Sequence, residues 1–445
     1  MSTYDLVIRG ATLVNHDGIG IADVAAREGR TAVIGSIAPG AGGIEIDGTG
    51  LHLLPGVIDT QVHFREPGME HKEDLESGSR AAVMGGVTAV FEMPNTRPNT
   101  ATAEAIADKL ARARGRMWCD HAFYVGATAE NADALGELER LPGTVGVKIF
   151  MGASTGDLLV DDDATLARVL RAIRRRCAVH AEDEPRLRER RHIAEAADRP
   201  HAHPDWRDAI SALTATKRLI KLARELGRRV HVLHITTAAE IEFLGQNRDV
   251  ATVEVTPQHL SLAAPECYDE LGTLAQMNPP IRGADEQAGL WRGIAHGIVD
   301  VIGSDHAPHT AEEKAQTYPA SPSGMPGVQT LLPLLLDHAQ AGRLSLPRLV
   351  DLTSAGAQRI FGIAGKGRLA VGYDADYTLV DLAAERRIEE GWLASKCGWS
   401  PFLGRTVKGW PVMTVIRGRP VMRDDELQGS AAGQPVRFWE TLAPG

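Results

Sequence analysis

The chain has 445 residues, of which 43% are hydrophobic and 24% charged, and its formal net charge is −10. With a mean hydropathy of −0.15, this composition indicates a globular protein and excludes a disordered or fibrous one. Basic residues are interspersed with acidic ones, so we expect no face that binds nucleic acid. No uncharged segment reaches the roughly 18 residues of a membrane span, and no signal-like segment opens the sequence. We therefore expect a cytoplasmic protein without a membrane partner.

Between residues 53 and 362, short apolar runs alternate with longer amphipathic stretches such as 101–114, 166–176 and 209–226. This alternation is typical of strand and helix units that build a parallel sheet. Eight units favour an α/β fold that closes into a barrel. The eight predicted strands are 54–59, 87–93, 119–127, 145–150, 177–180, 230–235, 251–255 and 299–303.

The two flanks carry short, Gly-punctuated runs that predict strands at 5–13, 31–37, 43–47, 372–381 and 413–421. Neither flank has enough apolar surface for a core of its own. We therefore expect residues 1–53 and 366–445 to form one composite β-sandwich domain beside a barrel of residues 54–365. The four cysteines are far apart in the sequence and are expected to be reduced thiols.

The densest chemical signal is the segment from Pro55 to Gly68, at the end of the first barrel strand. Strand alternation predicts that Asp59, Gln61 and His63 share a face, with neighbours about 6.6 Å apart. A lone histidine at a strand end is more often structural than a metal ligand. His63 becomes a candidate ligand because later strands end in similar chemistry.

Four later strands each deliver such a residue: Lys148, His180, His234 and Asp305. Catalytic groups of α/β barrels come from the carboxyl ends of several strands. An isolated ammonium is costly to bury, so Lys148 has to be paired, shifted toward neutrality or chemically modified.

Other histidines lack such companions. Val230, Val232 and His234 are predicted to share a face of their strand, so His231 is expected to point outward to the helices and to be structural. Eight others are expected to be surface or packing residues: His16, His52, His71, His121, His201, His203, His296 and His338.

From about residue 5 to 425, the sequence resembles the dihydroorotases of the amidohydrolase superfamily. Beyond the histidines, five segments carry the resemblance: His63-Phe64-Arg65-Glu66-Pro67-Gly68, Met93-Pro94-Asn95-Thr96, Asn278-Pro279-Pro280-Ile281-Arg282, Ser304-Asp305-His306-Ala307-Pro308-His309 and Gly324-Met325-Pro326-Gly327. The resemblance implies a TIM-like (β/α)8 barrel and the interconversion of dihydroorotate and carbamoyl aspartate in pyrimidine biosynthesis. It also implies one or two Zn2+ ions per chain.

The same resemblance implies that His63, His180, His234 and Asp305 are metal ligands and that Lys148 is carbamylated and bridges two metals. Most members of the family have a histidine where this chain has Gln61. A glutamine carbonyl is a weaker zinc ligand than imidazole. Three hypotheses follow: two metals with Gln61 as a poor ligand, one metal held by His180 and His234, or an inactive homologue.

Ring opening of a cyclic amide needs a nucleophilic water, a polarised carbonyl and a proton for the leaving nitrogen. A divalent metal activates water at neutral pH, and Asp305 is the expected general base; its structural alternative is a helix cap or a simple ligand. The substrate carboxylate needs a fixed cation, for which Arg65 is the candidate. Asn95 and His309 resemble further carboxylate contacts, and Asn278 resembles the segment that holds the ring, although each also fits an ordinary loop.

Two other functions remain open on the sequence. One is a different cyclic-amide hydrolase that acts on a neutral ring, such as an allantoinase or a hydantoinase (dihydropyrimidinase). The other is a catalytically silent scaffold subunit, which Gln61 favours and the retained Lys148, His180, His234 and Asp305 oppose. By analogy with relatives, we expect a homodimer or homotetramer.

Overall fold

The computed structural model describes residues 3–153 and 158–442. Eight of the described strands form one parallel sheet in the order β13-β12-β11-β10-β9-β8-β7-β6. A parallel bridge between Val62 and His306 joins the two edges. The fold is therefore a TIM-like (β/α)8 barrel, as the sequence predicts. Its strands are β6 (Val57–Val62), β7 (Val87–Glu92), β8 (Asp120–Gly126), β9 (Thr144–Phe150), β10 (Cys177–His180), β11 (Val230–Val232), β12 (Ala251–Val255) and β13 (Val301–Ile302).

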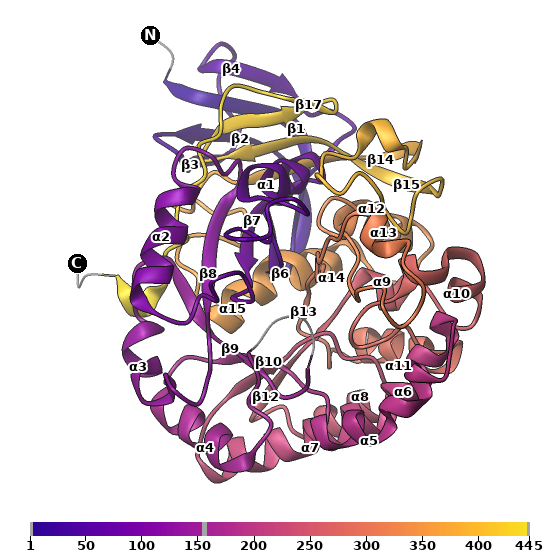
Figure 1. Cartoon of the computed structure of the whole chain (residues 1–445). Helices are drawn as coiled ribbons and strands as arrows, with labels where there is room; N and C mark the ends of the chain where they lie inside the picture. The colour runs from indigo at the N-terminus through magenta and orange to yellow at the C-terminus, as the bar shows by residue number, and fades with distance from the viewer. Residues whose placement is uncertain (1–2, 154–157, 443–445) are drawn as a thin grey trace.

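Helices surround the barrel (Figure 1). Several begin at a side chain that caps the free backbone N–H groups: Asp74, Thr102, Asp162 and Asp208 each accept a hydrogen bond from the third residue of their helix. The longer helices are α1 (Leu75–Met84), α2 (Ala103–Ala113), α4 (Asp163–Ala172), α5 (Glu184–Glu195), α7 (Ala209–Glu225), α8 (Ala238–Gly245), α11 (Ala284–Ala295) and α13 (Leu331–Gln340). The shorter ones are α3 (Leu135–Leu138), α6 (His203–Trp206), α9 (Pro257–Ser261), α10 (Glu266–Leu271), α12 (Ala311–Lys314), α14 (Leu346–Val350) and α15 (Gly356–Phe361).

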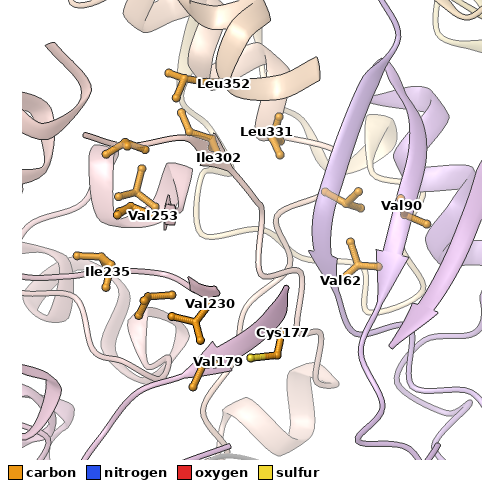
Figure 2. Packing of buried hydrophobic residues seen from close by; sticks show 14 of the residues in the cluster. Val62, Val90, Cys177, Val179, Val230, Ile235, Val253, Ile302, Leu331 and Leu352 are labelled. Atoms are coloured by element: carbon orange, nitrogen blue, oxygen red, sulfur yellow. The ribbon is translucent and has the colours of Figure 1, made fainter. Parts of the chain in front are cut away.

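The barrel strands separate two apolar clusters. Their outward side chains pack against the helices, and Figure 2 shows part of this layer, including Val62, Val90, Val179 and Leu331. The inward cluster fills the barrel interior with the side chains of Ile58, Phe91, Tyr124, Leu233 and Phe361, among others. Alternating apolar residues along each strand therefore stabilise both layers.

The predicted orientation of His231 is wrong. Val230 and Val232 belong to the outward cluster, whereas the buried His231 ring lies edge-on to Phe361 of the inward cluster, with centroids 5.5 Å apart. The error arose because β11 ends at Val232 and the backbone φ of His234 is +36°. Strand alternation does not continue to His234.

The two ends of the chain form a second sheet, at the top of Figure 1. It pairs in the order β17-β16-β15-β14-β5-β1-β2-β3, with β4 beside β1. The junction between the two flanks is antiparallel, with Leu54 of β5 opposite Thr378 of β14. The strands are β1 (Tyr4–Asn15), β2 (Gly18–Arg27), β3 (Arg30–Gly35), β4 (Gly42–Asp47), β5 (His52–Pro55), β14 (Tyr377–Arg387), β15 (Thr406–Ile416), β16 (Arg419–Arg423) and β17 (Glu426–Leu427).

After this sheet the chain returns to the barrel, where Gly433 N–H donates to the Met117 carbonyl at 2.9 Å and Val436 N–H to the His121 carbonyl at 2.8 Å. The domain limits at residues 53 and 366 remain predictions. All four cysteines are unpaired, and three of them are buried. Among the described residues, no helix combines the length and apolarity needed to cross a membrane.

A buried ion cluster connects the two sheets. Lys366 Nζ lies 2.6 Å from Asp120 of β8 and 3.2 Å from Asp374, and it also contacts Asp376. Burial alone lowers the pKa of this lysine, but Asp120 and its acidic neighbours outweigh that effect and raise it. The lysine therefore compensates buried carboxylates at the junction, together with Arg417 at Asp120 and Arg437 at Asp374.

We predict that Lys366→Met lowers the free energy of unfolding by about 3–5 kcal/mol, because it leaves the buried Asp376 without its cation and takes one of two from Asp120. The measurement is chemical denaturation of the full chain. Lys408→Met is the matched control, since its amine is exposed and 3.7 Å from Glu385. A loss below about 1 kcal/mol for Lys366→Met would contradict the role of the cluster.

Candidate active site

A small cavity lies at the carboxyl ends of the barrel strands. Its volume is about 20 Å3, which is room for roughly one water molecule or ion. Eleven of the described residues line the cavity: Gln61, His63, Lys148, Phe150, His180, His234, Asn278, Asp305, Ala307, Ser323 and Gly324.

Gln61 and His63 both reach Asp305 from the end of β6. Gln61 Nε2 donates to Asp305 Oδ1 at 2.9 Å, and His63 Nε2 lies 3.1 Å from the same oxygen. The expectation that Asp59 shares their face is wrong, because the register of β6 against β7 shifts between Asp59 and Val62. Asp59 Oδ1 instead accepts from Ser304 N–H at 2.9 Å, and burial raises the pKa of Asp59 to about 7.

A hydrogen bond to Asn95 fixes the tautomer of His63. His63 Nδ1 lies 2.7 Å from Asn95 Oδ1, so Nδ1 carries the proton and Nε2 presents a lone pair. Burial lowers the pKa of His63, which favours the neutral ring. Two atoms with lone pairs, His63 Nε2 and Asp305 Oδ1, therefore face each other, and this arrangement favours a bound cation.

His180 and His234 form a second pair, with His180 Nδ1 3.0 Å from His234 Nε2. His180 Nε2 donates to Glu182 Oε2 at 2.8 Å, so its Nδ1 presents a lone pair toward His234. Burial by itself raises the pKa of Glu182, but Arg207 outweighs this effect and holds the carboxyl ionised. The Arg207–Glu182 pair therefore orients His180.

Lys148 lies close to both pairs and is fully buried. Its Nζ has no hydrogen-bond partner among the described residues, and its recorded contact is the Phe150 ring, 4.6 Å away. Burial lowers the pKa of Lys148 to about 7. Burial lowers the pKa of Lys314 to about 7 as well, but Lys314 differs in donating to three backbone carbonyls at 2.9–3.1 Å.

The donor set fits a metal only if Lys148 takes part. Among the described residues, no group of three His, Cys, Asp or Glu side chains is placed to hold an ion. Each half of the site supplies two such donors, His63 with Asp305 and His180 with His234. Orphaned atoms remain on Gln61 Oε1, Lys148 Nζ and His234 Nδ1. An anionic oxygen ligand on Lys148 would complete both halves.

The backbone is strained at three of the candidate residues. The φ angles of Arg65, His234 and Asp305 are +63°, +36° and +47°, a region that residues with a side chain rarely adopt. The other described non-glycine residues with positive φ are Glu28, Arg417, Asp424 and Asp425. Such strain often accompanies functional sites, because the surrounding fold has to enforce it.

A cationic corner lies next to the cavity. Arg65 is buried, and its Nε donates to the Pro308 carbonyl at 3.1 Å. Lys72 Nζ donates to His309 Nδ1 at 3.1 Å, so His309 Nε2 carries the proton and donates to the carbonyl of Ser323 at 3.0 Å. Arg65 Nη2 lies 3.3 Å from His309 Nε2. Glu313 Oε1 lies 3.0 Å from Lys72 Nζ, so Arg65 is the charge of this corner that has no acidic partner among the described residues and can recognise a carboxylate.

Asn278 also lies at the cavity, where its Oδ1 is 2.9 Å from His203 Nε2. Burial lowers the pKa of His203 to about 3, so the ring is neutral. His203 is thus a buried residue that holds Asn278, a function that its isolated position in the sequence did not indicate. The cavity lining does not include Arg65, Asn95 or His309.

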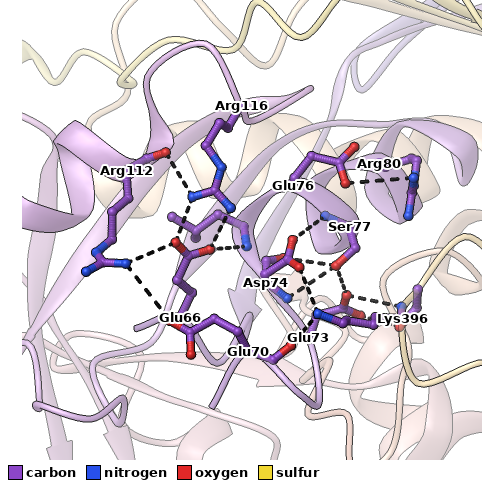
Figure 3. A network of polar contacts seen from close by, with 12 residues as sticks. Glu66, Glu70, Glu73, Asp74, Glu76, Ser77, Arg80, Arg112, Arg116 and Lys396 are labelled. Atoms are coloured by element: carbon purple, nitrogen blue, oxygen red, sulfur yellow. Dashed lines mark hydrogen bonds and ion pairs between the residues drawn. The ribbon is translucent and has the colours of Figure 1, made fainter. Parts of the chain in front are cut away.

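The loop that carries Arg65 is anchored by the polar network in Figure 3. The buried carboxylate of Glu66 accepts from Arg116 Nη1 at 2.7 Å and from Leu75 N–H at 3.0 Å. Glu73, also buried, contacts Ser395 and accepts from Lys396 N–H at 3.1 Å. Segments far apart in the sequence therefore hold the loop in place.

The chain matches the amidohydrolase family model over residues 52–421. The chain belongs to the amidohydrolase family. A dihydroorotase of Halobacterium salinarum is 39% identical and covers 86% of this chain and 89% of its own. An allantoinase of Rubrobacter xylanophilus is 36% identical and covers 98% of each chain.

Among solved structures, an L-hydantoinase (dihydropyrimidinase) of Arthrobacter aurescens superposes with a TM-score of 0.92 at 29% identity, covering 98% of this chain and 100% of its own. Relatives with three different names thus match most of this chain, and the hydantoinase superposes on both its barrel and its terminal sheet. The comparisons leave the substrate of this chain to be inferred from its own site.

Several residues of the site could not be identified from the sequence alone. Glu182 follows His180 by two positions, and this spacing was the available signal. Arg207, Lys72 and His203 lie in loops or a short helix, and nothing in their sequence surroundings indicated a contact with the site. Their contribution depends on segments that approach only in the folded barrel.

We predict that Glu66→Ala makes the loop of Arg65 sensitive to trypsin, because the buried carboxylate no longer holds it. Cleavage after Arg65 or Lys72 should be at least about tenfold faster than in the wild type, the effect of roughly 1.4 kcal/mol on local opening. Mass spectrometry of the fragments identifies the sites. Glu70→Ala, which removes a more exposed acid of the same loop, is the control and should change little. Equal cleavage of both variants would contradict the anchoring role.

Proposed function

We propose that this chain is a dihydroorotase, which reversibly hydrolyses (S)-dihydroorotate to N-carbamoyl-L-aspartate in pyrimidine biosynthesis. The observation that carries the proposal is the buried guanidinium of Arg65, which has no acidic partner among the described residues and lies beside a site for hydrolysis. A neutral cyclic amide has no group that requires this cation. Dihydroorotate has a carboxylate, which Arg65 would bind with the help of the neutral His309 ring.

Asp305 is the proposed general base. Its Oδ1 accepts a hydrogen bond from Gln61, and the residue lines the cavity. We expect Asp305 to take a proton from the attacking water and to return it to the ring nitrogen when the amide bond breaks. Ring closure follows the same steps in reverse.

The proposed ligands are His63 and Asp305 on one side and His180 and His234 on the other, with Lys148 between them. Zn2+ would polarise the substrate carbonyl and lower the pKa of water. Carbamylation converts the neutral amine of Lys148 and CO2 into an anionic carbamate and a proton, and so removes the cost of a buried ammonium. Gln61 is a doubtful ligand because an amide oxygen binds zinc more weakly than imidazole, although its Oε1 has no other partner among the described residues.

We predict that Arg65→Met lowers kcat/KM for dihydroorotate by about 30- to 4000-fold, since a buried charge pair with a ligand is worth roughly 2–5 kcal/mol. Zinc content should stay near the wild-type value, because Arg65 is not a proposed ligand. Arg80→Met, on the surface of α1, is the control. Unchanged turnover by Arg65→Met would remove the substrate assignment.

A second prediction concerns Gln61. After dialysis against a weak chelator, the wild type should retain about one zinc per chain and Gln61→His about two, because imidazole binds zinc more strongly than an amide. Elemental analysis of the purified chains gives the ratio. The same zinc content in both proteins would show that Gln61 does not limit the metal count.

The second candidate is an allantoinase, which the 36% identity to the Rubrobacter protein over 98% of the chain favours. Turnover of allantoin that survives in Arg65→Met would support it. A chain without zinc that hydrolyses neither substrate after zinc and bicarbonate are supplied would instead be a scaffold subunit.

A further inference from the structure

A second cavity opens at the other end of the barrel, where the strands begin. Its volume is about 460 Å3, which is within the range of small-molecule sites. Val145 of β9, the residues that precede β10 and β11, and the end of α15 form its wall, with Phe438, Trp439 and Glu440 from the C-terminal segment. It lies apart from the active site, because β9 and β10 run from this end toward Lys148 and His180.

The charge of this cavity is opposite to that of the chain. Six of its lining residues are arginines and one is a glutamate, while the chain has a net charge of −10. The sequence does not reveal this surface, since its arginines come from three separate segments. They are Arg174, Arg175, Arg176, Arg228, Arg229 and Arg359.

The nearby acids already have partners. Glu139 Oε1 accepts from the backbone N–H of Arg174 at 2.7 Å, and Glu440 accepts from Arg175 Nε at 3.1 Å. Asp351 is 2.7 Å from Arg359 and also pairs with Arg348. These contacts neutralise only part of the cluster. A positive charge therefore remains in the concave surface.

Two arginines have unused donors. Arg175 is buried, with Nη1 donating to the Thr144 carbonyl at 2.7 Å, but its Nη2 has no partner among the described residues. A buried donor that stays unpaired costs about 1–3 kcal/mol. Arg229 has an exposed side chain that makes no hydrogen bond or ion pair in the described part of the chain. Its positive charge repels that of Arg176. An anion in the cavity would pair with Arg229, and it would also satisfy Arg175 Nη2 if that buried guanidinium turned toward it.

We propose that this cavity binds the diphosphate or triphosphate group of a small molecule. Planar guanidinium groups form paired hydrogen bonds with phosphate oxygens, and several of them neutralise a group with more than one negative charge. Trp439, 59% exposed at the rim, offers an aromatic face on which a nucleoside base can stack. A nucleoside triphosphate and inorganic triphosphate are the two sources of this chemistry.

The test is isothermal titration of the full chain with inorganic triphosphate, ATP, UTP and citrate in low salt. We expect each chain to bind one molecule of triphosphate. Arg229→Gln should weaken it about 10- to 100-fold, the range for hydrogen bonds to charged groups. Arg27→Gln is the matched control, since Arg27 lies in the terminal sheet and has no recorded side-chain partner among the described residues. It should bind like the wild type.

Arg175→Met repeats the test at the buried position, with circular dichroism to establish that the variant folds. Tighter binding of ATP or UTP than of inorganic triphosphate, lost in Trp439→Ala, would identify a nucleotide; equal binding would identify the inorganic ion. The proposal is overturned if no triphosphate binds at millimolar concentration, if Arg229→Gln binds unchanged, or if citrate binds as tightly.

Discussion

The buried amine of Lys148 is the constraint on which the rest of the site depends. An ammonium in this position would lack the hydrogen-bond acceptors that stabilise the buried Lys314 and Lys366. A single aromatic contact is worth about 0.5–2 kcal/mol and does not replace them. The site is therefore suited to a neutral or modified lysine, and an anionic form would complete the two incomplete pairs of donors around it.

The barrel makes this arrangement feasible. Parallel strands bring Gln61, His63, Lys148, His180 and Asp305 to one edge from distant parts of the sequence. Hydrogen bonds to Asn95 and Glu182 then select the tautomers of His63 and His180. The strained backbone at His234 and Asp305 persists because packed strands and loops on all sides enforce it.

Much of this architecture could be predicted from the sequence. The apolar runs predicted the eight barrel strands, and the pairing of the two flanks followed from their short strands. Strand periodicity failed at Asp59 and His231, because a register shift and an early strand end interrupt it. The Arg207–Glu182 pair and the arginine cavity could not be predicted, since they join segments whose proximity only the folded chain establishes.

We expect Gln61 to affect the number of metals more than the reaction. The state of Lys148 is more fundamental, and it can be measured directly by 13C NMR of the zinc-loaded, active protein after exchange with 13C-bicarbonate. The account predicts one carbamate carbon signal per chain, absent from Lys148→Met. An active wild-type protein without that signal would contradict it.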